Sequence, residues 1–319
     1  MKEFDLIKHY FSEQSVNRKD VIEGIGDDCA ILQPNEKQQL AVTTDTLVAG
    51  VHFPIETLAR AVGHKVIAVS LSDLAAMGAE PAWVSLAITL PSIDEKWIKD
   101  FCSGVFELCE YFNVQLIGGD TTQGPLSITV TAQGFTPVGK HIPRGGANAG
   151  DWLYVTGEVG DAALALQVIQ GKIKVETIYQ ETLQRKLDFP QPRVLVGQVL
   201  RDYASAAIDI SDGLAADLAH ICVASNVGVN LIIDNLPLST AMRDTLSLDS
   251  AYKMALNGGD DYELLFTVCD DNKVAMETAI ANTGVNITCI GQLNSSHKIT
   301  TLLNGEHIYI DLQGFEHFS

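Results

Sequence analysis

The sequence predicts a two-domain α+β protein. Its 319 residues exceed the roughly 250–300 residues at which one hydrophobic core stops growing, and 46% of them are hydrophobic, which suffices for two cores. Glycines and other small residues at 143–151 interrupt the pattern of strands and helices. We therefore expect an N-terminal domain over 1–147 and a C-terminal domain over 148–319.

The N-terminal domain is expected to mix strands with helices. Short apolar and alternating runs predict strands at 39–44, 83–90, 114–117 and 126–135. Apolar residues at helical spacing predict helices at 57–77 and 94–112.

The C-terminal domain is expected to begin with a strand at 152–156. Helical patterns follow at 161–170, 176–187, 194–204 and 213–224. The other predicted strands lie at 206–210, 229–233, 264–268, 287–290, 298–303 and 307–311.

Charge and cysteine content limit the class of protein. The 21 basic and 40 acidic residues give a net charge of −19, which disfavours nucleic acid because basic surfaces bind phosphate backbones. The six cysteines form no C-x-x-C pair and are expected to be reduced, as in the cytoplasm. No apolar segment reaches the roughly 18 residues of a membrane span, and charged residues interrupt 1–12, which therefore lack the continuous apolar stretch of a signal peptide. We expect a cytoplasmic protein that binds neither nucleic acid nor membranes.

Acidic residues recur in five short segments with glycine, serine or threonine, and the first two precede position 50. GIGDD at 24–28 places carboxylates beside glycines that allow close approach of a ligand, although an exposed turn would use the same residues. Thr43, Thr44 and Asp45 offer hydroxyl and carboxylate oxygens of the kind that Mg²⁺ prefers. Strand propensity explains the threonines but not Asp45.

The other three segments contain Asp73, Asp120, Asp209 and Asp212. Asp73 interrupts an apolar helix, where a charge is costly unless it is paired or bound to metal, and helix capping is the alternative explanation. Asp120 follows two glycines, whose N–H groups can cradle phosphate. Asp209 and Asp212 open a helix, and helix N-termini attract carboxylates and phosphates. Together, the five segments favour metal-assisted phosphate chemistry.

Seven motifs, in this order along the chain, closely resemble the bacterial thiamine-monophosphate kinase family. They are GIGDDCA (24–30), TTDTLVAGVHF (43–53), SLSDLAAMGAEPAW (70–83), LIGGDTT (116–122), IDISDGL (208–214), NGGDDYEL (257–264) and GFEHF (314–318). The resemblance implies the fold of aminoimidazole ribonucleotide synthetase, with an N-terminal α+β domain that dimerises and a C-terminal α/β sandwich. It also implies transfer of the γ-phosphoryl group of ATP to thiamine monophosphate, which gives thiamine diphosphate and ADP.

The resemblance also implies roles for individual residues. The implied ligands of several Mg²⁺ ions are Asp28, Thr43, Thr44, Asp45, Asp73, Asp120, Asp209 and Asp212. The implied ATP contacts are Gly119, Asp120, Arg144 and Ser211, and the implied contacts to thiamine monophosphate are His52, Asp260 and Phe315. The family usually has glutamate at the position of Asp260. No side chain is needed as a general base, because an acceptor phosphate with a second pKa of roughly 6 is largely dianionic at neutral pH.

Two alternatives remain open at this point. Other enzymes of the same superfamily are aminoimidazole ribonucleotide synthetase, selenophosphate synthetase and a hydrogenase maturation protein. The maturation protein needs a terminal cysteine, whereas this chain ends His317-Phe318-Ser319. A noncatalytic sensor of nucleotide or thiamine phosphate is the alternative from another class, and its retention of the full set of acidic residues would be unexplained.

Overall fold

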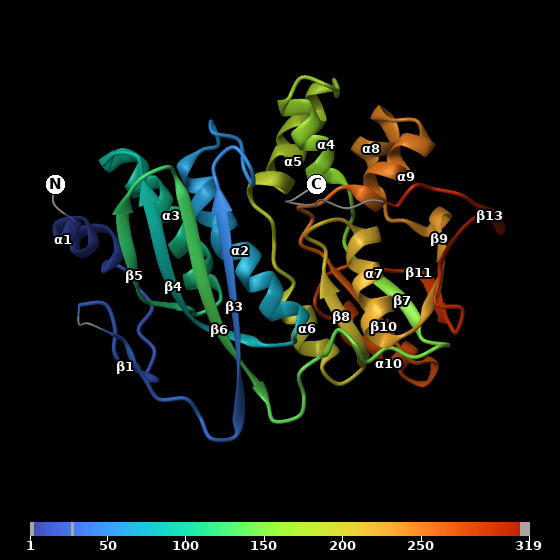
Figure 1. Cartoon of the computed structure of the whole chain (residues 1–319), viewed down its shortest axis with the longest axis horizontal. Coiled ribbons are helices and arrows are strands. Elements are labelled where there is room, and N and C mark those ends of the chain that lie inside the picture. The colour runs from blue at the N-terminus through green and yellow to red at the C-terminus, as the bar shows by residue number, and fades with distance from the viewer. Residues whose placement is uncertain (1–2, 27–28, 313–319) are drawn as a thin grey trace. The chain divides into compact units, whose positions relative to one another are not determined.

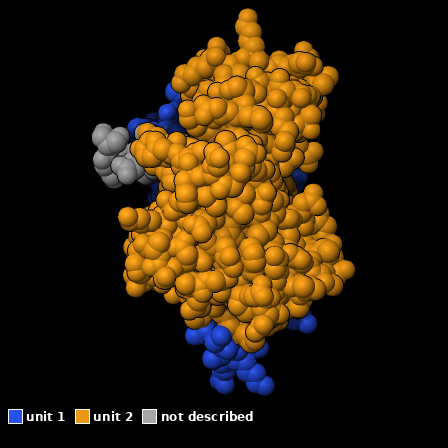
Figure 2. Space-filling view, turned by 90° about the vertical axis from the view of Figure 1, so that its right-hand side faces the viewer, with its two compact units in different colours: residues 1–74, 79–139 blue, residues 75–78, 140–319 orange. Residues whose placement is uncertain are grey.

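The chain forms two compact units (Figures 1 and 2). A computed structural model describes residues 3–26 and 29–312. Unit 1 comprises Met1–Leu74 and Ala79–Gly139, and unit 2 comprises Ala75–Gly78 and Lys140–Ser319. Each unit combines helices with a largely antiparallel sheet, so the predicted α+β class is confirmed. The domain boundary between residues 147 and 148 stays a prediction.

Unit 1 is built on a four-stranded sheet in the order β3-β6-β4-β5, in which only β4 and β5 are parallel neighbours. A separate two-stranded sheet pairs β1 with β2. In chain order the elements are α1 (Glu3–Leu6), the π-helical turn η1 (Ile7–Phe11), β1 (Val21–Glu23), β2 (Ile31–Leu32), β3 (Gln38–Val48), α2 (Ala59–Ala76), β4 (Glu80–Leu90), α3 (Glu95–Tyr111), β5 (Gln115–Gln123) and β6 (Ser127–Pro137).

The four-stranded sheet has one face against α2 and one open face (Figure 1). Strand register aligns Asp120 with Ala87, Thr129 and Thr46 in one row across the sheet, and these residues point to the open face. The next row contains Asp45, Val130 and Leu86, which point toward α2. The open face, defined here by the exposed or half-exposed side chains of Val42, Thr44, Thr46, Thr129, Ala87 and Asp120, is therefore distinct from the face that carries Asp45.

Helices α2 and α3 pack closely because each contributes a glycine to the contact. A Cβ atom at Gly63 would lie 2.0 Å from the carbonyl oxygen of Phe101, and one at Gly104 would lie 2.0 Å from that of Arg60. Asp94 caps α3 by accepting from the backbone N–H groups of Lys96 and Trp97. The two helices thus form a rigid layer beside the sheet.

Unit 2 is built on a seven-stranded sheet in the order β13-β12-β9-β11-β7-β10-β8. Its elements are β7 (Trp152–Thr156), α4 (Asp161–Ile169), α5 (Thr177–Asp188), α6 (Val194–Leu200), β8 (Ala204–Asp209), α7 (Leu214–Ser225), β9 (Gly228–Ile232), the 3-10 turn η2 (Ile233–Asn235), α8 (Thr240–Thr245), α9 (Leu248–Asn257), β10 (Leu264–Val268), the 3-10 turn η3 (Asp270–Asn272), α10 (Lys273–Ala281), β11 (Ile287–Asn294), β12 (Ile299–Leu303) and β13 (Glu306–Ile308).

Four candidate site residues of unit 2, Asp209, Ser211, Asp212 and Asp260, lie at one edge of its sheet. Strands β7 and β8 both pair antiparallel with β10, so they run in the same direction and end at the same edge. Asp209 is the last residue of β8, and Thr156 is the last residue of β7. The loops at 157–160, 210–213 and 258–263 meet at this edge.

None of the helices in the described part of the chain is long and apolar enough to span a membrane.

Candidate functional site

The first acidic cluster of unit 1 lies between β3 and α2. Asp45 accepts a hydrogen bond from the Ser70 hydroxyl at 2.9 Å, and Asp73 accepts one from the Thr43 hydroxyl. Thr43 and Asp45 are two residues apart on β3, whereas Ser70 and Asp73 are one turn apart on α2, so both pairs occupy the same stretch of the interface. The structure therefore brings together three of the predicted metal ligands, Thr43, Asp45 and Asp73.

The Asp45 carboxyl group is a candidate cation ligand because of its surroundings. Burial raises the pKa of Asp45 above its ordinary value of 3.8, and the hydrogen bond from Ser70 partly offsets this rise. A carboxylate that is removed from water is stabilised by a nearby cation. Oxygen atoms of carboxylates and hydroxyls are also the ligands that Mg²⁺ prefers.

Asp120 and Thr44 do not join this cluster. Both residues are exposed on the open face of the sheet, where Thr44 shares a hydrogen bond with Thr131. Asp120 lies within β5 rather than after it, because the strand continues through both glycines to Gln123. Glycine is required at position 119, since a Cβ atom there would lie 1.8 Å from the carbonyl oxygen of Leu86.

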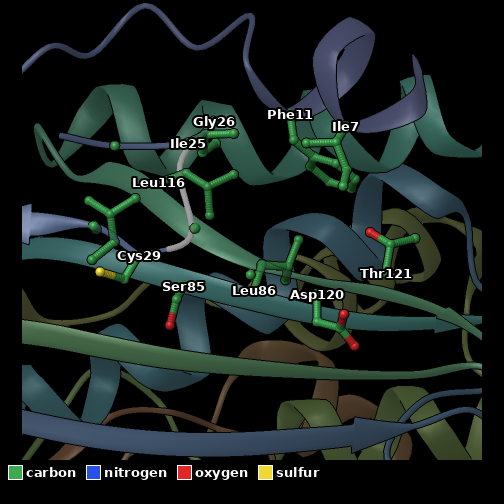
Figure 3. A pocket seen from close by; sticks show the side chains of 15 residues that line it. Ile7, Phe11, Ile25, Gly26, Cys29, Ser85, Leu86, Leu116, Asp120 and Thr121 are labelled. Atoms are coloured by element: carbon green, nitrogen blue, oxygen red, sulfur yellow. The ribbon is translucent and has the colours of Figure 1, made fainter. Parts of the chain in front are cut away.

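A pocket of about 620 Å³ lies beside Asp120 (Figure 3). Strands β4 and β5, the segment around Gly24–Gly26 and the first helical turns line this pocket. Ile7 and Phe11 lie near the end that contains Asp120 and Thr121, and Cys29 lies at the other end. Apolar side chains together with glycine backbone and one carboxylate suit a ligand that has an apolar ring and a polar group.

His52 follows β3 in unit 1 and has a defined ring orientation. Its Nδ1 atom accepts from the backbone N–H of Val48 at 3.0 Å. Because Nδ1 is the acceptor, a neutral His52 carries its proton on Nε2 and can donate from that atom.

The second group of candidate residues is the loop at 211–213 in unit 2. Ser211, Asp212 and Gly213 connect β8 to α7, and their three backbone N–H groups all donate to Oδ2 of Asp217, at 3.1, 3.2 and 3.2 Å. Asp209 is buried at the end of β8, whereas Ser211 and Asp212 are partly exposed. Burial and the nearby Asp212 carboxylate raise the pKa of Asp217 to about 7.

The loop at 258–263 packs beside this loop through backbone hydrogen bonds. Asp260 donates its N–H to the carbonyl oxygen of Ser211 at 2.9 Å, and Tyr262 donates to that of Ile210 at 2.8 Å. Asp260 and Tyr262 have positive φ angles of 69° and 51°, a conformation that costs non-glycine residues energy and is enriched at functional sites. The Tyr262 hydroxyl also donates to the Asp260 carboxylate at 2.9 Å, so this loop holds the predicted substrate contact in one orientation.

Buried polar groups support the same edge of the sheet. The Asp261 carboxylate accepts from the N–H of Gly160 at 2.8 Å, and burial raises its pKa well above 3.8. Asp161 accepts from the Ser239 hydroxyl at 2.5 Å. Glu263 accepts from Thr156 at 2.5 Å and from both Nε and Nη2 of Arg193. These bonds fix the strand ends from which the candidate residues project.

The thermal stability of unit 2 is expected to decrease as the pH rises, partly because of Asp161. Burial raises the pKa of Asp161 above 3.8, while Ser239 and Lys186 oppose this rise and Glu158 adds to it. A folded-state pKa above the unfolded value contributes stability that is complete below 3.8 and is lost as pH rises through the folded pKa. Asp161→Asn should therefore show a smaller fall in Tm than the wild type between about pH 4 and about pH 8, measured by circular dichroism.

The matched control for this prediction is Asp271→Asn. Asp271 is exposed in unit 2, so the control should retain the pH dependence of the wild type. Equal pH dependence in Asp161→Asn and the wild type would contradict the prediction.

The remaining predicted site residues are less defined. Asp28 and Phe315 lie outside the described residues, and Arg144 is exposed in unit 2. Within 3–26 and 29–312, no three His, Cys, Asp or Glu side chains converge closely enough to form a ready-made metal site. The assignment of metal and substrate contacts therefore stays a prediction.

Sequence reasoning did not select Asp217, Asp261 or Glu263, although each holds a loop beside a predicted residue. A partial signal was present for Asp217, which lies in the first turn of α7, where a carboxylate can satisfy helix N–H groups. The contacts of Asp261 and Glu263 join residues more than 60 positions apart. Local sequence patterns do not reveal such pairings.

Comparison with known families now defines the class of protein. Residues 26–136 match the family model "AIR synthase related protein, N-terminal domain", and residues 148–304 match "AIR synthase related protein, C-terminal domain". The chain is thus a two-domain AIR synthase-related protein, and the fold expected from the sequence resemblance is confirmed.

Individual relatives narrow this class. The thiamine-monophosphate kinase of Salmonella typhimurium is 49% identical over 99% of this chain and 98% of its own length. The crystal structure of the thiamine-monophosphate kinase of Stenotrophomonas maltophilia is 45% identical, with a TM-score of 0.86 over 95% of this chain and 96% of that one. AaThiL, solved in complex with AMPPCP and TMP, is 29% identical, with a TM-score of 0.78 over 99% of this chain and 96% of that one. The chain belongs to the thiamine-monophosphate kinase family.

Proposed function

We propose that the protein is a cytoplasmic thiamine-phosphate kinase of thiamine diphosphate biosynthesis, which transfers the γ-phosphoryl group of ATP to thiamine monophosphate. The observation that carries this proposal is the hydroxyl-supported pair Asp45 and Asp73 in a chain that is 49% identical to a thiamine-monophosphate kinase over nearly its full length. The complex of AaThiL with AMPPCP, an ATP analogue, and TMP supports the choice of both substrates.

The pocket beside Asp120 is the proposed ATP site. Its apolar residues suit the flat surface of a nucleobase, and the backbone at Gly118 and Gly119 can approach phosphate closely because these residues have no side chain. Asp120 and Thr121 place a carboxylate and a hydroxyl at one end of this pocket, near Ile7 and Phe11 (Figure 3). Arg144 and Ser211 are proposed as further ATP contacts.

Mg²⁺ is the proposed metal, and the donor atoms present suit it. Thr43, Asp45 and Asp73 supply hydroxyl and carboxylate oxygens in one interface, and the proposed set also contains Asp28, Thr44, Asp120, Asp209 and Asp212. Bound Mg²⁺ neutralises phosphate charge and aligns the reacting groups.

The chain's residues assist phosphoryl transfer by binding and orienting the substrates. An oxygen of the acceptor phosphate attacks Pγ of ATP, the bond from Pγ to the β,γ-bridging oxygen breaks, and ADP leaves with that oxygen. The dianionic acceptor needs no general base, so no side chain is assigned to proton transfer. Arg144 is the proposed cationic side chain that offsets the charge on the phosphates.

Three residues are the proposed contacts to thiamine monophosphate. His52 can donate from Nε2 because Val48 donates to its Nδ1. The Asp260 carboxylate, held by Tyr262, suits the fixed positive charge of the thiazolium ring. Phe315 offers an aromatic face to the same cation.

A single assay tests this function. Purified protein is incubated with Mg-ATP and thiamine monophosphate, and thiamine diphosphate and ADP are quantified. The proposal expects one ADP for each thiamine diphosphate formed. ATP binding without product would support a sensor, and ATP hydrolysis without thiamine diphosphate would support another enzyme of the superfamily.

A homodimer is also proposed, formed through the exposed apolar residues Leu40 and Val42 of unit 1. Val42 is 58% exposed and Leu40 is 50% exposed on edge strand β3, and exposed apolar sheet faces are typical of interfaces. Val42→Glu should convert the dimer to a monomer in analytical ultracentrifugation, because the interface would bury the new charge. Val138→Glu, at a residue that is 64% exposed beyond the end of β6, is the control and should remain dimeric. A monomeric wild type would contradict this proposal.

A further inference from the structure

One side chain of unit 2 organises an entire loop of candidate ligands. Oδ2 of Asp217 accepts from the consecutive N–H groups of Ser211, Asp212 and Gly213 at 3.1, 3.2 and 3.2 Å. Consecutive N–H groups before a helix form a concave site that binds anions. In this protein the chain supplies the anion itself, from a residue that is only 2% exposed.

This arrangement argues against phosphate binding by the backbone N–H groups at the start of α7, which the sequence analysis expected for this helix N-terminus. Each backbone N–H group has one hydrogen to donate, and Asp217 already accepts from all three. A phosphate group could use these N–H groups only by displacing a buried carboxylate. The groups of this loop that can serve ATP or a cation are therefore the Ser211 hydroxyl and the Asp212 carboxylate, not the helix N-terminus.

We propose that Asp217 is a positioning residue that fixes the 211–213 loop so that Ser211 and Asp212 face their ligands in one defined arrangement. This inference rests on the proposed function for the identity of those ligands. The N–H of Asp260 also holds the loop by donating to the carbonyl oxygen of Ser211 at 2.9 Å, but Gly213 has a φ angle of 120°, which gives the chain freedom at the point where the loop joins the helix. Three hydrogen bonds to a carboxylate remove that freedom.

The positions of Asp212 and Asp217 also couple loop order to cation binding. The N–H of Asp212 donates to the Asp217 carboxylate at 3.2 Å, so Asp217 holds the backbone from which the proposed cation ligand projects. Loss of Asp217 should therefore weaken Mg²⁺ binding as well as loop order.

A purely structural helix cap is the competing explanation, and the two roles differ in what they affect. A cap would change Tm and the exchange of the three amide hydrogens that it accepts from. A positioning residue also changes the Mg²⁺ dependence of nucleotide binding. The variants are Asp217→Ala, which removes the acceptor, and Asp217→Asn, which keeps the shape and one acceptor oxygen.

The matched control is Asp151→Asn. Asp151 is 4% exposed in the same unit and accepts from the Asn148 N–H at 2.9 Å and the Ser205 hydroxyl at 2.6 Å. It precedes β7, so it lies at the opposite edge of the sheet from the 211–213 loop. This control reports how much stability is lost when a buried, hydrogen-bonded aspartate that lies away from the 211–213 loop is changed.

The experiment has two readouts on the full chain. Hydrogen exchange of the Ser211, Asp212 and Gly213 amides is measured by NMR without ligand, and AMPPCP binding is measured by calorimetry as a function of Mg²⁺ concentration. Asp217→Ala should accelerate exchange at all three amides and raise the Mg²⁺ concentration for half-maximal binding about 10-fold or more. Asp217→Asn should show smaller changes in both, and Asp151→Asn should lower Tm without changing either.

An unchanged Mg²⁺ dependence of AMPPCP binding in Asp217→Ala would overturn the inference and leave Asp217 as a helix cap, as would changes equal to those in Asp151→Asn. If Asp217→Ala does not fold, Asp217→Asn decides by the same two readouts. Failure of the wild type to make thiamine diphosphate would overturn the proposed function instead, and the amide exchange would still decide whether Asp217 holds the loop.

Discussion

Asp45→Asn is expected to lower kcat/KM for thiamine diphosphate formation at least about 1000-fold, while Tm stays equal to or above that of the wild type. Loss of one preorganised electrostatic contact to a reacting phosphate typically costs about 100-fold to 1000-fold, and Asp45 is proposed to act on several phosphate charges through bound Mg²⁺. The fold should tolerate the change, because burial raises the pKa of Asp45 and a neutral amide avoids that cost. The amide oxygen can still accept the hydrogen bond from Ser70.

Coupled detection of ADP and direct quantification of thiamine diphosphate measure the loss, and circular dichroism measures Tm. Asp249→Asn is the matched control, because Asp249 is exposed in unit 2 and pairs only weakly with Lys253 across one helical turn. This control should keep wild-type turnover. Wild-type turnover in Asp45→Asn would refute the assignment of Asp45 as a metal ligand, and a large fall in Tm would show that its role is structural.

Apolar runs with clear ends could be predicted accurately from the sequence. The predicted strands at 152–156 and 264–268 agree with β7 and β10 at both ends, because buried strands that are covered on both faces are continuously apolar. The helix predicted at 94–112 agrees with α3 except for one residue at each end, and Asp94 is its N-cap. Helices α8 and α9 were not predicted, although Ser239 and Ser247 cap them and gave a local signal.

The strands that carry the candidate ligands were harder to predict because polar residues continue them. The prediction at 39–44 ended before Asp45, yet β3 continues to Val48. Thr44 and Thr46 extend it through hydrogen bonds to threonines of β6, while Asp45 takes an inward position that an apolar residue normally occupies. The prediction at 114–117 likewise ended before the glycines through which β5 continues.

The same limit applies to the candidate site. Residue chemistry alone indicated Asp45 and Asp73, and the structure places them on facing surfaces of β3 and α2. The sequence did not indicate that Asp120 points to the other face of the sheet, because this depends on the register of four strands. Asp217 and Glu263 were not predicted as site residues. Their role depends on the groups to which they are hydrogen-bonded, and the tertiary structure determines which groups those are.

Arg193→Met is expected to lower the stability of unit 2 by about 3–5 kcal/mol, because it leaves a buried charge without its partner. The Glu263 side chain is 5% exposed and pairs with Arg193, whose side chain is 21% exposed. After the change, the Thr156 hydroxyl would still donate to that carboxylate, at 2.5 Å. At roughly 2–4 °C per kcal/mol for a unit of this size, Tm should fall by roughly 10 °C in differential scanning calorimetry.

The double variant Arg193→Met with Glu263→Gln separates the contribution of charge to the lost stability from the contribution of packing. If the cost arises from an unpaired carboxylate, the neutral amide should recover a large part of the lost Tm, since uncharged polar groups cost less to bury than ions. Lys253→Met is the control for loss of an exposed ion pair and should change stability by less than about 1 kcal/mol. No recovery in the double variant would show that Arg193 stabilises the unit by packing rather than by its charge. Recovery of Tm together with reduced turnover would show in addition that the ion pair maintains the geometry of the adjacent Asp260 loop.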